Sequence, residues 1–484
     1  MKVKSMKKNY IYNLVLTVVN MIFPLITAPY LSYVLGAENI GKVNYATSII
    51  SWFILFASFG IPRYGIREIA RNRDNKKELT NSFWNLLLIQ VIISFITIIL
   101  YLIIIFNIKV FRQDINLYIL MVIMIILNIF SIDWFYQGIE EYGYITSRNL
   151  IFKLISIILI FTMINDRDDY LMYALINILA LSFNNILNYF NTKKYIDKKL
   201  YNLRFLYYIK ELRVYFITTL IIALYTQLDQ TFIGAKSQKD LAYYVRSKTL
   251  LGVGFSIVNS LITIFIPRTA YLAESNYNEY KKIVNKSINY IYILSFPCFV
   301  GVLLLSGEIM LLLGGAEFLP ARYSLQITSI LVIITSVGSW QINQVLLPNK
   351  LENLALKIQT IAAIISILLN IILIKKFSYI GAAISWLITE ISLTTLEGIF
   401  IRLKCRELKI KYFNKSAIKY FISVIIMGVV ILLVKKLIKK NIYIIATSLI
   451  VGPISYFGMI ILLKDNIIIE LINQLKIKLK GRKL

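Results

Sequence analysis

Residues 225–268, YTQLDQTFIGAKSQKDLAYYVRSKTLLGVGFSIVNSLITIFIPR, form two apolar segments on either side of a short polar turn, with charged side chains inside both. Asp229 lies in the first segment, and Arg246 and Lys248 lie in the second. An ionisable group inside a membrane span needs a partner, a water-filled cavity or a function. Asp229 and Arg246 each lie roughly eight residues from the turn, or about 12 Å along a helix, so two adjacent spans place them at the same depth.

A related pattern occurs once earlier in the chain. Residues 35–63, LGAENIGKVNYATSIISWFILFASFGIPR, and residues 233–268 both open with an apolar residue and Gly-Ala, and both end in Ile-Pro-Arg. A tyrosine follows nine residues after the glycine in each copy, Tyr45 and Tyr243. The distance from glycine to proline differs, so the repeat is weak. Weak internal repeats are typical of transporters whose substrate site lies where two repeated halves meet.

The composition predicts a membrane protein with many spans. Of the 484 residues 58% are apolar and 16% are charged, and the mean hydropathy is +0.70. A net charge of +28 would suggest nucleic acid in a soluble protein, but here the excess falls in loops between apolar segments. The chain has no histidine, so a proton relay would use carboxylates. Cys298 and Cys405 show no metal-ligand or disulfide spacing, and we expect no metal or cofactor.

About fourteen segments are long enough to cross roughly 30 Å of hydrocarbon, which places both termini on one side. Lysine and arginine concentrate in residues 63–77, 193–213 and 402–419, which predicts that these loops and both termini are cytoplasmic. One cluster would lie outside against this rule: Lys435, Lys436, Lys439 and Lys440.

Several motifs, in order, resemble the Wzx family of oligosaccharide flippases. They include ITAPYLSYVLGAENIGKVNYATSIISWF, FGIPRYGIREIAR, SIDWFYQGIEEYGYITSRN, LDQTFIGAKS with AYYVRSKTL, LLLGGAEFLPARYSLQI and NIILIKKFSYIGAAISWLITE. Together with neighbouring motifs they cover most of residues 14–397.

The resemblance implies the exporter fold shared by the MATE drug exporters and the lipid II flippase MurJ. This is an all-α polytopic membrane protein with two pseudo-symmetric six-helix bundles around a central cavity and two further helices. The bundles would be residues 1–213 and 214–417, and residues 418–484 would hold the last two spans and a basic cytoplasmic tail. The resemblance also implies transfer of an undecaprenyl-diphosphate-linked oligosaccharide across a bacterial cell membrane for O-antigen or capsule synthesis.

Such a substrate has a large anionic head and a lipid tail, so basic side chains in a cavity can hold its diphosphate. The candidates are Arg246 and Lys248, then Lys42 and Lys153 in other spans, and Arg63 and Arg268 at the inner mouth. Each has a structural alternative. Lys42, Lys153 and Arg268 lie near span ends and would extend to the interface. Arg63 would set the membrane orientation or contact headgroups, and Arg246 would neutralise Asp229.

Three carboxylates are candidates for coupling or gating. Glu390 lies near the midplane of its span and could exchange a proton or hold a sodium ion. The alternative is a neutral Glu390 bonded to Asn343 or Gln344 of another span. Asp133, near the inner end of its span, and Asp229 are gating candidates.

Three rival functions are weighed against a flippase. A MATE-like exporter of cationic drugs calls for an acidic cavity, whereas residues 225–268 are basic overall. A membrane glycosyltransferase or polysaccharide polymerase usually needs a sizeable outer loop, and a scaffold needs no buried arginine or lysine. We therefore expect a transporter and not an enzyme, with membrane lipid, a lipid-linked oligosaccharide and H⁺ or Na⁺ as partners and no nucleic acid. Whether it acts alone or with a polysaccharide polymerase stays open.

Overall fold

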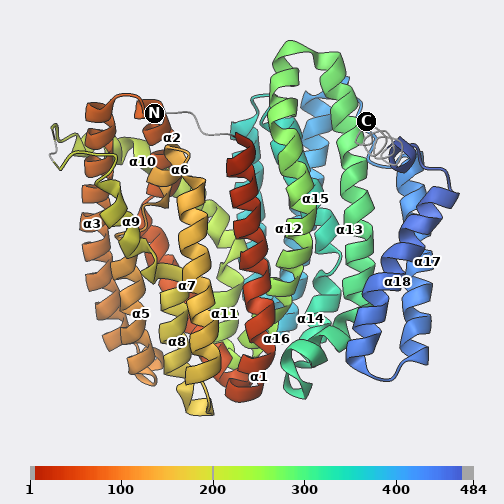
Figure 1. Cartoon of the computed structure of the whole chain (residues 1–484), viewed down its shortest axis with the longest axis horizontal. Coiled ribbons are helices and arrows are strands. Elements are labelled where there is room, and N and C mark those ends of the chain that lie inside the picture. The colour runs from red at the N-terminus through yellow and green to blue at the C-terminus, as the bar shows by residue number, and fades with distance from the viewer. Residues whose placement is uncertain (1–5, 199–200, 471–484) are drawn as a thin grey trace, which may run out of the picture. The chain divides into compact units, whose positions relative to one another are not determined.

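The computed structural model describes residues 6–198 and 201–470, and the regular secondary structure of these residues is helical (Figure 1). The chain divides into two compact units, Met1–Val245 and Arg246–Leu484, called unit 1 and unit 2 below. The expected boundaries after residues 213 and 417 come from the two-bundle fold and stay predictions. The basic tail from residue 471 onward lies outside the described residues.

Unit 1 is built from a long first helix followed by shorter helices. They are α1 (Met6–Ser58), α2 (Ile61–Asn72), α3 (Lys76–Asn107), α4 (Lys109–Arg112), α5 (Ile115–Asn128), α6 (Asp133–Gly138), α7 (Tyr142–Met163), η1 (Arg167–Asp169), α8 (Tyr170–Ile178), η2 (Leu179–Phe183), α9 (Asn185–Thr192), α10 (Phe205–Thr226), α11 (Leu228–Lys236) and the start of α12 (Gln238–Ser275).

Unit 2 begins within α12, and its further helices follow in chain order. They are α13 (Tyr277–Gly314), η3 (Ala316–Phe318), α14 (Ala321–Thr328), α15 (Leu331–Trp340), η4 (Gln341–Leu346), α16 (Glu352–Lys404), η5 (Arg406–Leu408), α17 (Lys415–Leu437) and α18 (Asn441–Leu462). The segment η4 is a π-helical turn that continues α15.

The helices account for the predicted spans. Ten helices of the described residues are long and apolar enough to cross a membrane, or twelve if each of two bent helix pairs forms one span. Two of the ten candidate spans include α1 and α16, which are each 53 residues long. A non-helical residue interrupts each of them, Gly36 (φ 73°) in α1 and Ser378 (φ 51°) in α16. At 1.5 Å per residue each would be about 80 Å long, far more than one crossing needs. Counting both limbs of each gives the fourteen predicted spans.

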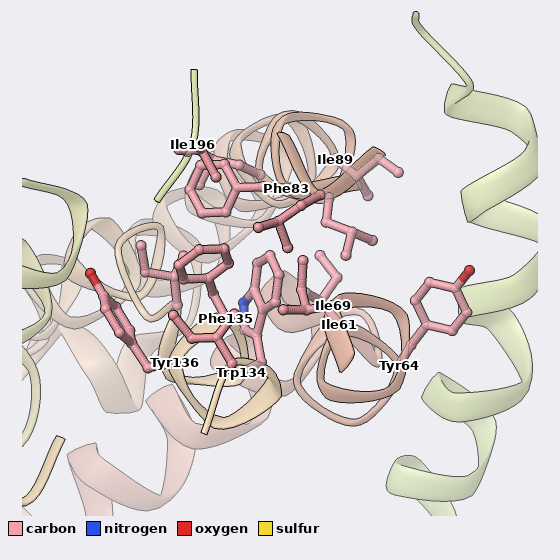
Figure 2. Packing of buried hydrophobic residues seen from close by; sticks show 14 of the residues in the cluster. Ile61, Tyr64, Ile69, Phe83, Ile89, Trp134, Phe135, Tyr136 and Ile196 are labelled. Atoms are coloured by element: carbon pink, nitrogen blue, oxygen red, sulfur yellow. The ribbon is translucent and has the colours of Figure 1, made fainter. Parts of the chain in front are cut away.

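The motif SIDWFYQG forms the core of one end of unit 1 (Figure 2). Trp134 and Phe135 are buried in a cluster with Phe83 of α3, whose ring centroid lies 5.9 Å from that of Trp134 and 5.2 Å from that of Phe135. Gly65 of α2 lets Trp134 approach, because a Cβ there would lie 2.6 Å from the indole. One of the motifs that carry the family resemblance is therefore a packing motif in this part of the molecule.

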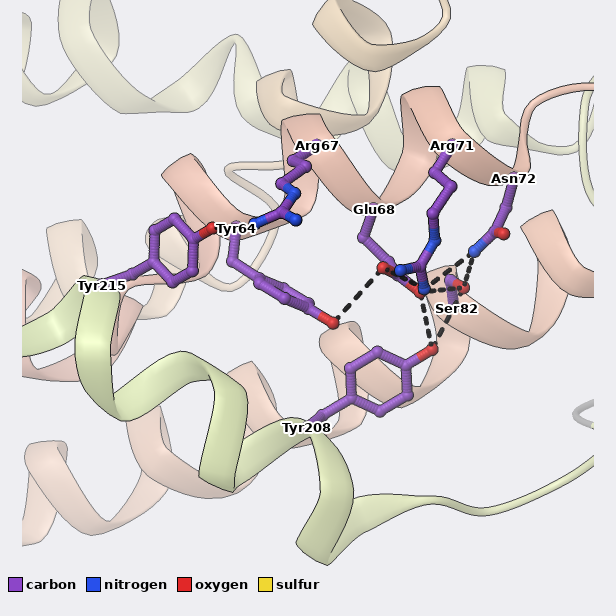
Figure 3. A network of polar contacts seen from close by, with 8 residues as sticks. All are labelled: Tyr64, Arg67, Glu68, Arg71, Asn72, Ser82, Tyr208 and Tyr215. Atoms are coloured by element: carbon purple, nitrogen blue, oxygen red, sulfur yellow. Dashed lines mark hydrogen bonds and ion pairs between the residues drawn. The ribbon is translucent and has the colours of Figure 1, made fainter. Parts of the chain in front are cut away.

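A buried carboxylate joins α2 to α10 at the same end (Figure 3). Glu68 accepts hydrogen bonds from the hydroxyls of Tyr64 at 3.3 Å and Tyr208 at 3.4 Å, and its ion pair with Arg71 measures 2.8 Å. Asn72 also donates to it at 3.0 Å. This network gives the buried charge several donors and fixes the start of α10 against α2.

In unit 2, the hairpin of α17 and α18 packs on α13 (Figure 1). Lys435, near the end of α17, forms an ion pair with Glu308 of α13 at 2.9 Å and donates to the carbonyl of Leu304 at 2.8 Å. One lysine of the cluster that departs from the charge rule thus has a structural role within the helix packing. The side of the membrane on which each end lies stays a prediction.

Candidate functional site

Arg246, at the start of unit 2, contacts the end of α13. Its guanidinium donates to the carbonyl of Leu313 at 2.6 Å and lies 4.6 Å from the ring centroid of Phe318. The last carbonyls of a helix have no partner within the helix, so a guanidinium at this place stabilises the helix end. Arg246 therefore has a structural contact beside any role toward substrate. Its predicted pairing with Asp229 stays a prediction.

Lys248 and Glu390, predicted from separate spans, are brought to the same tryptophan. The ammonium of Lys248 lies 5.1 Å from the ring centroid of Trp386 on α16. The indole N–H of Trp386 donates to Oε1 of Glu390, one turn further along α16, at 3.3 Å. Glu390 is 8% exposed. A cation, an aromatic face and a carboxylate thus meet inside the membrane-spanning part of unit 2.

The predicted alternative, a hydrogen bond from Glu390 to Asn343 or Gln344, is not found in the structure. Gln344 donates to the carbonyl of Ile262 at 3.1 Å and accepts from Ser287 at 2.7 Å. Asn343 donates to the carbonyl of Ser339 at 2.8 Å. The π-helical turn directs both amides toward partners other than Glu390.

In unit 1, Asp133 belongs to a polar cluster whose other members, Arg148 and Asn188, were not among the predicted residues. It pairs with Arg148 of α7 at 2.9 Å and accepts from the amide of Asn188 on α9 at 2.8 Å. The side chain of Arg148 is 2% exposed, against 30% for Asp133. Arg148 stands at the beginning of an apolar span, and this charge was the signal that could have found it. The sequence did not show that its partner would be Asp133, fifteen residues earlier.

The other basic candidates have separate surroundings, and Lys153 lies in the middle of α7 rather than near a span end as expected. Lys153 contacts Asn20 and lies 5.3 Å from the ring centroid of Phe23, and Lys42 lies 5.1 Å from that of Tyr170. Arg268 is 62% exposed and pairs with Glu279 at 3.0 Å. Arg63 is exposed. The roles of these four residues toward substrate stay predictions.

The first copy of the repeat contacts α11 within unit 1, two residues before the second copy begins. The hydroxyl of Thr231 on α11 lies 2.8 Å from that of Ser48 and accepts from the indole of Trp52 at 2.9 Å. Nearby, Asp229 is buried and accepts from the hydroxyl of Tyr244 at 2.5 Å. Asp229 thus sits beside the place where the repeats meet.

Comparison with known proteins identifies the family. The model of the family described as polysaccharide biosynthesis protein matches residues 6–273. A putative O-antigen transporter of Escherichia coli (strain K12) is 25% identical over 408 residues, which are 82% of this chain and 97% of that protein. A probable low-salt glycan biosynthesis flippase, Agl15, of Haloferax volcanii is 28% identical over 128 residues, 25% of this chain and 26% of that protein.

Solved structures show the fold. The lipid II flippase MurJ in an inward closed conformation superimposes with a TM-score of 0.73 at 16% identity, over 93% of this chain and 97% of that one. An inward-facing multidrug resistance MATE family transporter of the MOP superfamily gives 0.63 at 13% identity, over 84% and 97%. The protein is thus a multi-pass membrane transporter and not an enzyme. It belongs to the polysaccharide biosynthesis protein family.

Proposed function

We propose that the protein is a flippase that moves an undecaprenyl-diphosphate-linked oligosaccharide from the cytoplasmic to the outer leaflet of a bacterial cell membrane. The product would serve synthesis of a surface polysaccharide such as O-antigen or capsule. The movement would occur by ion-coupled alternating access, with both termini in the cytoplasm. Support for the substrate class comes from the E. coli relative named an O-antigen transporter, which matches over 82% of this chain.

The observation that carries the proposal is the contact of Lys248 with Trp386 in membrane-spanning helices. An ammonium can neutralise part of a diphosphate, and a tryptophan face can stack on a sugar ring. A cationic drug would be repelled by Lys248, which disfavours the small-molecule exporter. Arg246 is a second candidate for the diphosphate, and Glu390, bonded to Trp386, is the candidate for ion coupling.

Replacing Lys248 with alanine is expected to reduce export of the lipid-linked oligosaccharide about tenfold or more, because a hydrogen bond to a charged group contributes about 1.5–3 kcal/mol. The measurement compares surface glycan and the lipid-linked unit on the cytoplasmic face, in cells whose only flippase is the native protein or the variant. Lys248→Arg should retain most of the export. Lys350→Ala removes an exposed lysine paired with Glu274 and is the matched control.

Equal export by Lys248→Ala and Lys350→Ala, at equal amounts of protein, would show that Lys248 does not hold the substrate. A cell that lacks the protein and still exports the glycan would refute the flippase itself.

Glu390→Gln is expected to abolish the dependence of export on a proton or sodium gradient, and an unchanged dependence would exclude Glu390 as the coupling group.

A further inference from the structure

The loop between α16 and α17 carries an almost fully exposed aromatic side chain between three lysines. Residues 409–415 read KIKYFNK, and Phe413 is 93% exposed. Lys409, Lys411 and Lys415 are exposed as well, and within the part of the chain that the structure describes none of them pairs with a carboxylate. Phe413 would gain free energy by leaving water, and the lysines would gain it by meeting negative charge.

The backbone of this loop is fixed on both sides of Phe413. The side-chain amide of Asn285 on α13 donates to the carbonyl of Leu408 at 3.1 Å, and its oxygen accepts from the backbone N–H of Lys411 at 3.1 Å. Leu408 is fully buried. Asn414 caps α17, since its side chain accepts a backbone N–H of the first turn at 2.9 Å. The exposed ring therefore projects from a loop with defined hydrogen bonds.

Unit 1 contains a similar asparagine clamp. Asn85 of α3 donates to the carbonyl of Asn202 at 2.8 Å and accepts from the backbone N–H of Arg204 at 2.7 Å. The clamped loop leads into α10 and presents Leu203 and Leu206, which are 58% and 81% exposed. Both clamped loops lie in basic stretches whose charge predicts a cytoplasmic position. Because the arrangement occurs in each unit, it is a feature of the fold.

The helix that follows the loop in unit 2 indicates which surface covers Phe413. With 23 residues α17 is about 35 Å long, so it crosses roughly 30 Å of hydrocarbon with its ends at the interfaces. Ile418, Phe421 and Ile425 form an exposed row along it, which contacts lipid chains in a membrane. Phe413 precedes this row and lies at the level of the headgroups. Basic residues directly next to a span are typical of segments that bind anionic lipid.

We propose that residues 409–415 form a docking site for anionic phospholipid, with Phe413 inserted among the headgroups and the three lysines against their phosphates. Asn285 is a positioning residue, because it holds the backbone that carries these side chains. The site takes lipid of the surrounding bilayer and is distinct from Lys248, the proposed contact of the transported substrate. Binding fixes the start of α17, and with it the hairpin of α17 and α18, at the membrane surface.

The test measures thermal unfolding of the purified full-length protein in detergent micelles to which phosphatidylglycerol or phosphatidylcholine is added in increasing amounts. A lipid that binds only the folded protein raises its unfolding midpoint. Phosphatidylglycerol should raise the midpoint of the native protein more than phosphatidylcholine does, and NaCl should reduce this difference by screening. An equal response to both lipids would overturn the proposal and would leave another protein as the occupant of the loop.

Variants then assign the response to this loop. Replacing all three lysines with glutamine should raise the phosphatidylglycerol concentration for half of the effect at least about tenfold, because each basic residue near an anionic surface adds to the attraction. Phe413→Ser should raise it as well. Phe421→Ser, the matched control, removes a ring from the row that faces lipid chains and should change the midpoint equally in both lipids. Asn285→Ala should weaken the phosphatidylglycerol effect although every lysine remains.

A triple lysine variant with the native half-effective concentration would overturn the proposal, and so would equal effects of Phe413→Ser and Phe421→Ser. If Asn285→Ala does not fold, Phe413→Trp provides a direct measurement. Lipid brominated near its headgroup should quench the added indole beyond the quenching of the native tryptophans, and no additional quenching would show that position 413 lies outside the membrane. No measurement uses a glycan, so these results are independent of the export assay for the flippase.

Discussion

Replacing Asp133 with alanine is expected to destabilise the protein by about 3 kcal/mol, because it leaves a buried guanidinium without its carboxylate. Arg148 is 2% exposed, and its Nε atom has no hydrogen-bond partner among the described residues. Its hydrogen bonds go to Asp133, Asn188 and Asn149, and Asp133 is the charged partner among them. The midpoint of thermal unfolding in detergent should fall by roughly 5 °C or more.

Companion variants separate the buried charge from the loss of a side chain. Arg148→Leu should be less harmful than Asp133→Ala, because Asp133 is 30% exposed and can be hydrated when its partner is removed. The double variant Asp133→Ala with Arg148→Leu should recover much of the stability, since it leaves neither charge buried. A double variant as unstable as the sum of the single ones would contradict this account. Asp133→Ala that keeps its stability but loses export would instead support the predicted gating role.

The number and order of the spans could be predicted because a backbone in lipid must satisfy its own hydrogen bonds, which restricts the chain to long apolar helices. The breaks also follow from local sequence. Gly36 adopts φ 73°, a conformation that glycine tolerates, and the Leu-Gly-Ala of the repeat marked that place. Ser378, at φ 51°, has no comparable signal, because serine rarely adopts a positive φ and does not mark such a place in a sequence.

The site could be predicted only as a set of ionisable groups within spans, because partners depend on the rotation and approach of helices. Arg246 bonds to the carbonyl of Leu313, and a backbone acceptor leaves no trace in side-chain patterns. The contact of Lys248 with Trp386 joins helices more than a hundred residues apart. Glu397 of α16 is 0% exposed but was not among the predicted residues, because it lies near the end of its span, where a carboxylate usually reaches water. Its burial arises from Gln341 and Tyr412, which pack over that end.

Replacing Gly41 with alanine is expected to destabilise the protein by about 3 kcal/mol or more, because the added methyl group would overlap backbone atoms. Gly41 follows the break in α1, and a Cβ there would lie 2.0 Å from the carbonyl oxygen of Gln238 and 2.4 Å from its carbon. These atoms begin α12, so relief requires the two copies of the repeat to move apart within unit 1. The amount of folded protein recovered from membranes and its unfolding midpoint are the measurements.

Gly234, in the second copy of the repeat, provides an instructive contrast. A Cβ there would lie 2.2 Å from the Tyr45 ring, which is a side chain and can turn aside. Gly234→Ala should therefore destabilise by about 1 to 3 kcal/mol, less than Gly41→Ala, and adding Tyr45→Ala should restore part of that loss. Gly307→Ala is the matched control, because no atom lies within 4 Å of its Cβ position and alanine favours a helix. If Gly41→Ala is as stable as Gly307→Ala, the repeats do not pack against each other at Gly41. If Gly234→Ala destabilises the protein and Gly41→Ala does not, the Tyr45 ring, and not the backbone of α12, limits how closely the two copies of the repeat approach each other.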